Sequence, residues 1–399
     1  MDIWPASFLS ANMAHIHPEL DSAVGWIPMT YNEPIMTTCK KCGKASEEIA
    51  EVLAFCAECI AQADEDTLAE LAEIHARSRE SFGLPARPPS AADGLQCGLC
   101  QNKCKIALGG RGYCGVRGNE NGRLVGGTAQ SATVSWYYDP LPTNCVADWV
   151  CPAGSGAGYP QWAHRNGPEH GFFNLAVFYE ACTFDCLFCQ NWHYRKRSIS
   201  GDIHTAEELA ASVTPSTSCI CFFGGDPTCQ LPHAIAAAKL ARRQNNKQIL
   251  RICWETNGSM SPELLDEMLN LSLESGGCIK FDLKAMDENI HKALCGVSNR
   301  RTLENFARAA RRISERPPPL LIASTLLVPG YIDAQEVKAI ASFIADLEPS
   351  IPYALLGFHG NFLMRDLPAT SWKQAESCLE AAKTSGLKNV RLGNVHILR

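Results

Sequence analysis

The sequence lacks an excess of positive charge, a long apolar run and a leader-like N-terminus. Its 36 basic and 42 acidic residues give a net charge of −6, which argues against general binding to nucleic acid or anionic membranes. No apolar run reaches the roughly 20 residues that a membrane-spanning helix needs. The N-terminus has no basic segment followed by an apolar one, so we expect no signal peptide and a cytoplasmic protein.

Cysteine, by contrast, is abundant, with 20 residues in a chain of 399. In a reducing cytosol, cysteines at short spacings favour metal binding over disulfide bonds. Eleven of them form three groups, at 39/42/56/59, 97/100/104/114 and 182/186/189. Most of the others lie in apolar surroundings and are expected to be buried and inert. They are Cys145, Cys151, Cys219, Cys221, Cys229, Cys253, Cys278, Cys295 and Cys378.

The chain is organised around Cys182, Cys186 and Cys189, in the spacing C-x3-C-x2-C. An apolar run at 173–178 precedes them and predicts a buried strand. Three thiolates can hold three irons of a [4Fe–4S] cluster and leave the fourth iron open, as catalytic metal sites require. The alternative is three of the four ligands of a zinc ion. The unusual C-x3-C spacing and the aromatic residues within the loop favour the cluster.

Residues 1–92 are predicted to form an N-terminal module resembling a zinc ribbon or treble clef. Cys39, Cys42, Cys56 and Cys59 make two C-x2-C pairs, which predict a zinc site. The first thirty-odd residues show no clear period, whereas 46–81 has helical periodicity. The metal either stabilises a module too small to fold unaided or shapes a docking surface for a partner. A proline-rich linker at 84–90 marks the boundary.

Residues 93–170 are predicted to form a second metal-binding region. Cys97, Cys100, Cys104 and Cys114 follow the spacing C-x2-C-x3-C-x9-C with glycines among them, and glycines let the backbone wrap closely around a metal. Zinc and an iron–sulfur cluster both remain open on this spacing. The following segment, 138–160, is expected to be long and irregular, and its cysteines are either extra ligands or buried thiols.

Residues 171–399 alternate between apolar strands and amphipathic helices, the pattern of βα units. Helix starts are marked by a capping box at Thr205–Glu208 and by Ser261 before a proline. The predicted fold is α/β, a partial or full parallel (β/α) barrel with small cysteine-rich modules in front of it. The expected strands are 174–179, 218–223, 250–256, 278–283, 320–327, 353–358 and one near 390–397.

Polar motifs follow six of these strands in succession. In a parallel barrel the carboxyl ends of all strands meet at one rim, where the chemistry of such folds takes place. Any one motif alone would be ordinary turn or core chemistry, but six at successive strand ends indicate a site. They are the cysteine loop, Gly224-Gly225-Asp226-Pro227, Glu255-Thr256-Asn257-Gly258, Asp282 with Lys284, Val328-Pro329-Gly330, and His359.

As a set, these motifs resemble the radical S-adenosylmethionine (SAM) superfamily, in particular the branch with the pyruvate formate-lyase activating enzymes. The resemblance covers 171–397, and residues 95–125 are more weakly similar to the front of AmmeMemoRadiSam-type proteins. It implies a [4Fe–4S] cluster on Cys182, Cys186 and Cys189, with SAM chelating the open iron. It also implies a set of cofactor-binding residues at the strand ends: Phe188, Gly224, Gly225, Asp226, Glu255, Thr256, Asp282, Lys284 and His359.

The implied reaction is reductive cleavage of SAM to methionine and a 5′-deoxyadenosyl radical, which takes a hydrogen atom from the substrate. A flavodoxin- or ferredoxin-like electron donor is expected as a partner. The radical either activates a glycyl radical enzyme, a protein substrate, or modifies a different peptide or small molecule. The N-terminal cysteine groups depart from simple activating enzymes. A non-catalytic iron–sulfur or zinc scaffold is the third hypothesis, and the intact cofactor motifs argue against it.

Overall fold

A nine-stranded sheet forms the centre of the computed structural model, which describes residues 35–245, 249–313 and 316–399. Seven consecutive strands of the sheet are parallel, and they are β8 (Phe173–Tyr179), β10 (Thr217–Gly224), β11 (Arg251–Thr256), β12 (Ile279–Asp282), β13 (Leu321–Leu327), β14 (Tyr353–Gly357) and β15 (Val390–Gly393). The antiparallel strands β7 (Ser131–Pro140) and β9 (Ile203–Thr205) extend it beyond β8. The strand order is linear, so the barrel is partial rather than closed.

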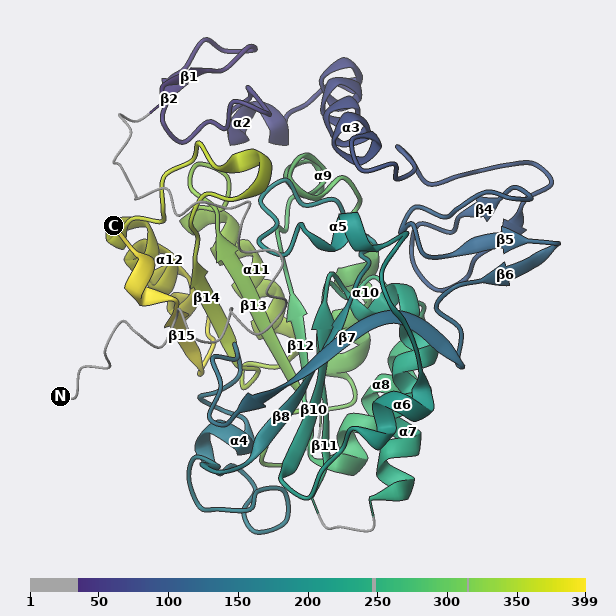
Figure 1. Ribbon diagram of the computed structural model, residues 1–399. Helices are drawn as coiled ribbons and strands as arrows, with labels where there is room; N and C mark the ends of the chain where they lie inside the picture. The colour runs from purple at the N-terminus through teal and green to yellow at the C-terminus, as the bar shows by residue number, and fades with distance from the viewer. Residues whose placement is uncertain (1–34, 246–248, 314–315) are drawn as a thin grey trace, which may run out of the picture. The chain divides into compact units, whose positions relative to one another are not determined.

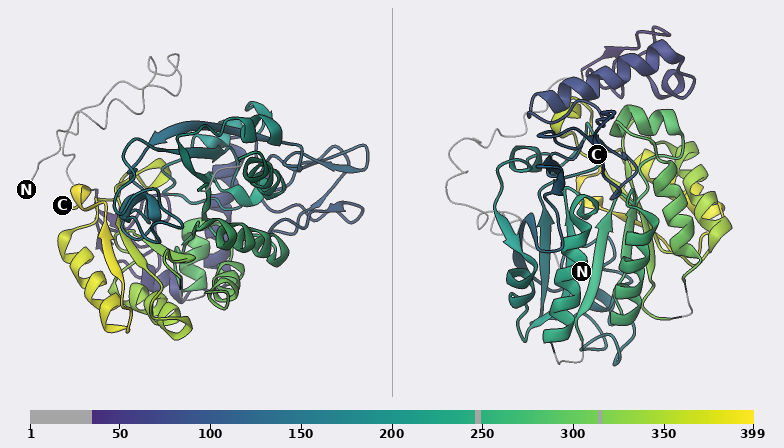
Figure 2. Two further views of the ribbon diagram at one scale, coloured as in Figure 1. Left: turned by 90° about the horizontal axis from the view of Figure 1, so that it is seen from below. Right: turned by 90° about the vertical axis from the view of Figure 1, so that its right-hand side faces the viewer.

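Helices connect the parallel strands and lie along the outer side of the sheet (Figures 1 and 2). They are α6 (Ala206–Ala211), α7 (Leu231–Gln244), α8 (Pro262–Ser275), α9 (Glu288–Cys295), α10 (Arg300–Ala310), α11 (Ala334–Leu347) and α12 (Trp372–Thr384), with three short 3-10 turns, η1 (Pro227–Gln230), η2 (Phe362–Met364) and η3 (Val395–Ile397). No helix in the described part of the chain is both long and apolar enough to cross a membrane.

The two helix starts expected from the sequence are confirmed. Thr205 and Glu208 form a reciprocal capping box at α6, where each side chain accepts a backbone N–H of the other residue. Ser261 caps α8 by accepting the N–H of Leu264, and Pro262 is the first helical residue. These caps fix the first residues of α6 and α8, and so limit how far the preceding strands β9 and β11 can extend.

All seven expected strands are present, with ends that differ from the prediction by a few residues at most. The expectation for 138–160 is wrong in part. Residues 138–140 complete β7, and Pro152–Ser155 form the short helix α4. The sequence analysis missed β7 because only its first half alternates buried and partly buried side chains, so the period-2 signal is short.

The N-terminal part consists of two short strands, β1 (Thr37–Thr38) and β2 (Ala45–Ser46), followed by α2 (Ala57–Ala61) and α3 (Glu65–Glu80). The helical expectation for 46–81 is wrong for its first ten residues, which form turns between β2 and α2. Their apolar side chains are buried by these turns rather than by a helix face. Two small hairpins follow, β3 (Leu95–Gln96) with β4 (Lys105–Ile106) and β5 (Gly118–Glu120) with β6 (Arg123–Val125). The first thirty-odd residues lie outside the described part.

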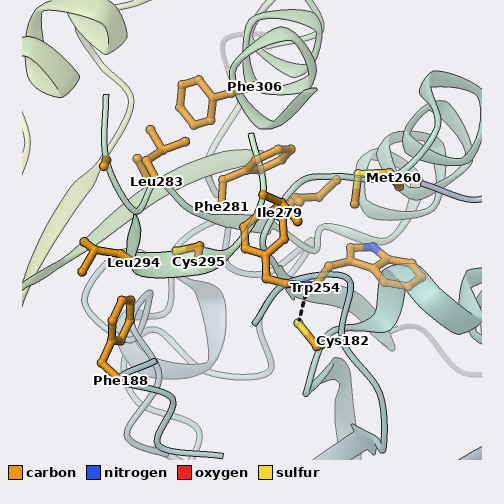
Figure 3. Packing of buried hydrophobic residues seen from close by; sticks show 14 of the residues in the cluster. Cys182, Phe188, Trp254, Met260, Ile279, Phe281, Leu283, Leu294, Cys295 and Phe306 are labelled. Carbon is orange, nitrogen blue, oxygen red and sulfur yellow. Dashed lines mark hydrogen bonds between the residues drawn. The ribbon is translucent and has the colours of Figure 1, made fainter. Parts of the chain in front are cut away.

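One hydrophobic core runs from the N-terminal cysteine module into the barrel. Tyr331, after β13, links the two: its hydroxyl donates to the carbonyl of Phe55 and accepts the N–H of Ala50. Figure 3 shows aromatic side chains of this core in the barrel, with Cys182 and Phe188 in the same cluster. The division at 92/93 and 170/171 stays a prediction, although these contacts mean that its first and last parts pack on each other.

Candidate functional site

The cysteine loop lies over the carboxyl ends of the parallel strands. β8 ends at Tyr179, and the loop then carries Cys182, Cys186 and Cys189 to the wall of a cavity of about 200 Å³. The strand-end motifs of β10, β11 and β12 form a large part of the remaining wall. Every strand-end residue predicted to bind the cofactor lines this cavity except His359, namely Phe188, Gly224, Gly225, Asp226, Glu255, Thr256, Asp282 and Lys284.

His359 does not reach the cavity. It follows β14, but its side chain is exposed, and its Nδ1 lies 3.1 Å from the carbonyl oxygen of Gly360. The side chains that β13 and β14 contribute to the cavity are apolar, Leu326 and Leu356.

The glycine pair after β10 is required by the cysteine loop itself. Gly224 has φ +115°, and a Cβ there would lie 2.4 Å from the backbone nitrogen of Tyr179. A Cβ on Gly225 would lie 2.3 Å from the carbonyl oxygen of Ala181. Backbone hydrogen bonds join the two segments, from Gly225 to Tyr179 and from Asp226 to Ala181. Only glycine permits this approach, which locks the start of the cysteine loop to the end of β10.

Asp226 joins the ends of two neighbouring strands. Its buried carboxylate accepts hydrogen bonds from the N–H groups of Thr228 and Asn257, at 2.8 and 2.6 Å, and from the hydroxyl of Thr256 at 3.0 Å. Burial raises the pKa of Asp226, and these donors work against the rise. The residue therefore holds β10 and β11 in register at the cavity wall.

Charged groups at the ends of β11 and β12 are paired across the cavity wall. Lys284 forms a 2.7 Å ion pair with Asp282, and its ammonium lies 5.8 Å from the ring centroid of Phe188. Burial alone would lower the pKa of Lys284, but the charge of Asp282 raises it, so the ammonium stays protonated. Glu255 accepts a hydrogen bond of 2.7 Å from Lys280. Lys280 lies one layer of side chains deeper in the barrel.

Asn257 is a residue of the third motif for which the sequence analysis gave no role. Its side-chain amide donates to the hydroxyl of Thr183 at 2.8 Å and faces the sulfur of Cys182 at 3.7 Å. The backbone N–H of Phe184 also faces this sulfur, at 3.4 Å. N–H donors to sulfur are typical of the surroundings of thiolate ligands, and they tune the cluster that the sulfur holds.

A buried charge network supports the cysteine loop, and the sequence analysis missed it. Asp185 accepts from Arg195 at 3.1 Å and from His75 at 3.0 Å, and Arg79 lies 3.8 Å away. Burial would raise the pKa of Asp185, but the hydrogen bond from His75 and the two guanidinium groups lower it to about 2. Two of these partners come from α3, so the N-terminal part helps to position the loop.

The three loop thiols fit a cluster better than a single ion. Burial raises the pKa of Cys182 and Cys189, so these thiols need a metal to become thiolates. The buried guanidinium of Arg195 lies beside Cys189 and donates to the carbonyl of Cys186. A positive charge here suits an anionic cluster. The sulfurs of Cys182, Cys186 and Cys189 also do not all lie within 4.8 Å of one another, the spacing at which thiols could share one ion.

Cys39, Cys42, Cys56 and Cys59 form a compact four-thiol site. Their sulfurs all lie within 4.8 Å of one another, and among the described residues they are the one group of three or more candidate ligands at this spacing. The Cys42 and Cys56 sulfurs are 3.8 Å apart. Bonds of about 2.3 Å to a tetrahedral zinc ion place thiolates about 3.8 Å apart, so the geometry fits zinc.

The second cysteine group gains a member that the sequence analysis had set aside. Cys97, Cys100, Cys104 and Cys114 line a small enclosed cavity together with Cys229 from η1. Cys229 hydrogen-bonds Cys114, and this interaction lowers the pKa of Cys114 to about 6. Cys229, one of the nine cysteines expected to be mostly buried and inert, is buried but lies beside this group. The sequence signal for this placement is that Cys229 lies three residues after Asp226, next to the motif at the end of β10.

Comparisons with known proteins agree with this geometry. Residues 176–344 match the Radical SAM superfamily. The chain is 30% identical over 206 residues to the isethionate sulfite-lyase activating enzyme of Desulfovibrio desulfuricans, covering 50% of this chain and 60% of that one. It is 29% identical over 190 residues to the pyruvate formate-lyase 1-activating enzyme of Escherichia coli K12, covering 46% and 73%.

Among solved structures, a domain of pyruvate-formate lyase-activating enzyme from Bacteroides vulgatus is 25% identical, with a TM-score of 0.36. The match covers 44% of this chain and 98% of that domain. The chain spans about 60% of the length of its Desulfovibrio relative, and residues 1–175 lie outside the superfamily match.

Proposed function

We propose that this chain, which carries a radical SAM domain, binds a [4Fe–4S] cluster through Cys182, Cys186 and Cys189 and cleaves SAM reductively. The observation that carries the proposal is the single cavity into which the cysteine loop and three strand-end motifs converge. Its residues come from the loop after β8 and from the carboxyl ends of β10 to β14, over more than 100 positions of sequence. A non-catalytic scaffold would need the thiols but not this wall of polar strand ends.

The bound groups would supply one-electron reduction of the sulfonium, breaking its carbon–sulfur bond to give methionine and a 5′-deoxyadenosyl radical that abstracts hydrogen from a substrate. The chain's own residues would hold the cofactor and shield it from water. Lys284 offers a protonated ammonium for the methionine carboxylate, while Asp282 orients that ammonium. Phe188 and Leu356 exclude water from the wall.

The remaining strand-end residues act mainly through the loop in this proposal. Gly224 and Gly225 allow the loop to lie against β10, and backbone groups of this turn remain at the cavity wall for the methionine ammonium. Asp226 fixes Thr256 and the β11 end. His359 is left as a candidate for binding the adenosyl group only if the segment around it moves, because its side chain is exposed.

For the N-terminal cysteines we propose two different metals. The 3.8 Å separation of Cys42 and Cys56 supports a structural zinc ion at the first group. At the second group, with Cys229, the sulfurs do not reach single-ion spacing among the described residues, which favours an iron–sulfur cluster there. The division into 1–92, 93–170 and 171–399 stays part of the proposal, with β7 of the middle part paired to β8 of the last.

The substrate we propose is a protein, in which the radical abstracts hydrogen from a backbone glycine. Support comes from the two activating enzymes to which the chain is similar. A flavodoxin- or ferredoxin-like protein would deliver the electron. We place these reactions in the cytoplasm as part of the proposal. Modification of another peptide or a small molecule is the alternative outcome of the substrate test.

Electron paramagnetic resonance of the reduced protein tests the cofactor assignment. Addition of SAM should change the cluster signal of the wild type, and SAM labelled with ¹⁷O in its carboxylate should broaden it. Cys186→Ala should lose the SAM-responsive signal, whereas Cys378→Ala, a buried thiol on α12, should keep it. An unchanged signal in cluster-loaded wild type would contradict the proposal. A glycyl radical signal on a candidate protein substrate would identify the activase; turnover of another substrate without it would exclude this role.

A further inference from the structure

A second, deeper cavity inside the barrel is lined by six cysteines that belong to none of the three sequence groups. Its volume is about 260 Å³, and the thiols come from positions scattered over more than 130 residues: Cys145, Cys151, Cys219, Cys221, Cys253 and Cys278. The sequence analysis expected most of these thiols to be buried and inert, and it did not indicate that they share one cavity. The structure assigns an iron–sulfur cluster to this chamber, held by thiolates of these cysteines.

The chamber departs from an ordinary barrel interior. Inward-facing positions of parallel barrels are normally filled by branched aliphatic side chains. Here alternate residues of β10, Cys219 and Cys221, and Cys253 of β11 face inward instead, together with Cys278 just before β12. Cys221 and Cys253 are register partners on adjacent strands, and the sulfurs of Cys253 and Cys278 lie 4.0 Å apart. Small side chains at these positions leave a cavity where close packing would be the rule.

The remaining thiols come from the segment that closes the chamber. Cys145 and Cys151 lie in the irregular stretch that ends in α4, which covers the amino-terminal ends of the strands (Figure 1). Cys145 reaches from there to the inward-facing side chains of the strands, where its sulfur lies 3.5 Å from the carboxylate of Glu255. This gives the stretch 138–160 the role that its sequence did not reveal.

The chamber carries a positive charge directed at the thiols. Lys280 on β12 is 3% exposed, and its ammonium lies 3.1 Å from the sulfur of Cys145 and 3.2 Å from that of Cys221. A charge buried this deeply is costly unless it is paired, and among the residues that the structure describes its one carboxylate partner is the partly exposed Glu255. An iron–sulfur cluster with thiolate ligands is anionic and would complete the pairing.

The geometry favours a cluster over a single ion. In the described part of the chain, the six thiols do not gather at the spacing that Cys39, Cys42, Cys56 and Cys59 reach. They surround a volume instead, as ligands to separate irons do. The chamber also adjoins the cofactor cavity, because Phe223 and Glu255 line both. A cluster here would therefore lie one layer of side chains below the proposed SAM site.

Iron analysis of full-length variants tests this assignment. The protein is reconstituted anaerobically with ⁵⁷Fe and sulfide, and iron, zinc and sulfide are measured per chain. The double variant Cys221→Ala, Cys253→Ala should lose about two to four irons with their sulfide, while Cys378→Ala loses none. Full iron content in the double variant, or zinc in place of iron at these cysteines in the wild type, would overturn the inference.

The SAM-responsive signal distinguishes this inference from the proposed function. This signal should persist in the double variant. Iron content then reports on the inner cluster, and the SAM-responsive signal reports on the loop cluster. If the double variant does not fold, Lys280→Met keeps every thiol in place and removes only the charge. It should lower the midpoint potential of a cluster signal that does not respond to SAM. No shift in any such signal would overturn the inner cluster.

Discussion

Replacing Asp185 should loosen the cysteine loop and destabilise the protein, because this carboxylate pairs with three cationic or basic side chains. Its pKa falls from 3.8 to about 2 in the folded chain. Each pKa unit corresponds to about 1.4 kcal/mol, so the network contributes about 2–3 kcal/mol near neutral pH. Both Asp185→Asn and Asp185→Ala leave Arg195 buried without its carboxylate. Asp185→Asn keeps the shape and one acceptor oxygen and should cost about 2–3 kcal/mol, whereas Asp185→Ala also removes every acceptor and should cost about 3–5 kcal/mol.

The stabilisation by Asp185 should depend on pH in one direction. The folded pKa lies below the unfolded one, so the stabilisation is complete above about pH 4 and is lost as the pH falls from 4 towards 2. Urea unfolding of wild type and Asp185→Asn should therefore differ at pH 7 and converge in acid. Asp202→Asn, which removes an exposed partner of Arg197, is the matched control and should change little.

A second readout is the cluster itself. Asp185 lies between two of the proposed iron ligands, Cys182 and Cys186, so its loss should lower the iron retained by the loop more than the zinc retained by the N-terminal module. Equal unfolding midpoints for wild type and Asp185→Ala at pH 7, with equal iron retention, would refute the reasoning about this network.

Three further predictions concern other parts of the molecule. Gly225→Ala should abolish SAM cleavage while the N-terminal zinc stays bound, because a Cβ there would meet the Ala181 carbonyl at 2.3 Å; metal analysis and product assay check this, and a fully active variant would contradict it. Cys42→Ser should reduce zinc binding and lower the thermal midpoint without removing iron, measured by metal analysis and calorimetry. Asn257→Ala should shift the reduction potential of the SAM-responsive cluster downwards in a redox titration, since it removes an N–H donor facing Cys182; an unchanged potential would count against that contact.

The barrel and most of its rim could be predicted because their signals are local. Apolar runs of strand length, two strong helix caps and motifs directly after each strand all lie within short windows of sequence. The parallel topology then brings the strand ends together by geometry alone. His359 shows the limit of this reasoning, because a residue after a strand can turn outward, and the direction depends on the loop that follows.

The support of the site could not be predicted, because it depends on contacts between distant segments. Asp185 contacts His75, which lies on a helix 110 positions earlier, and the sequence around neither residue indicates the other as its partner. The six chamber thiols stand singly or one residue apart, and each alone is an ordinary buried cysteine. Only the alternation of Cys219 and Cys221 along one strand hinted that they share an inward face.

The most direct test of the central claim is the release of 5′-deoxyadenosine. Cluster-loaded protein is incubated anaerobically with SAM and a strong reductant, and 5′-deoxyadenosine and methionine are quantified by liquid chromatography with mass spectrometry. The account predicts both products in equal amounts from wild type and Cys378→Ala, and neither from Cys186→Ala. Wild-type protein with its loop cluster intact that releases no 5′-deoxyadenosine would contradict it.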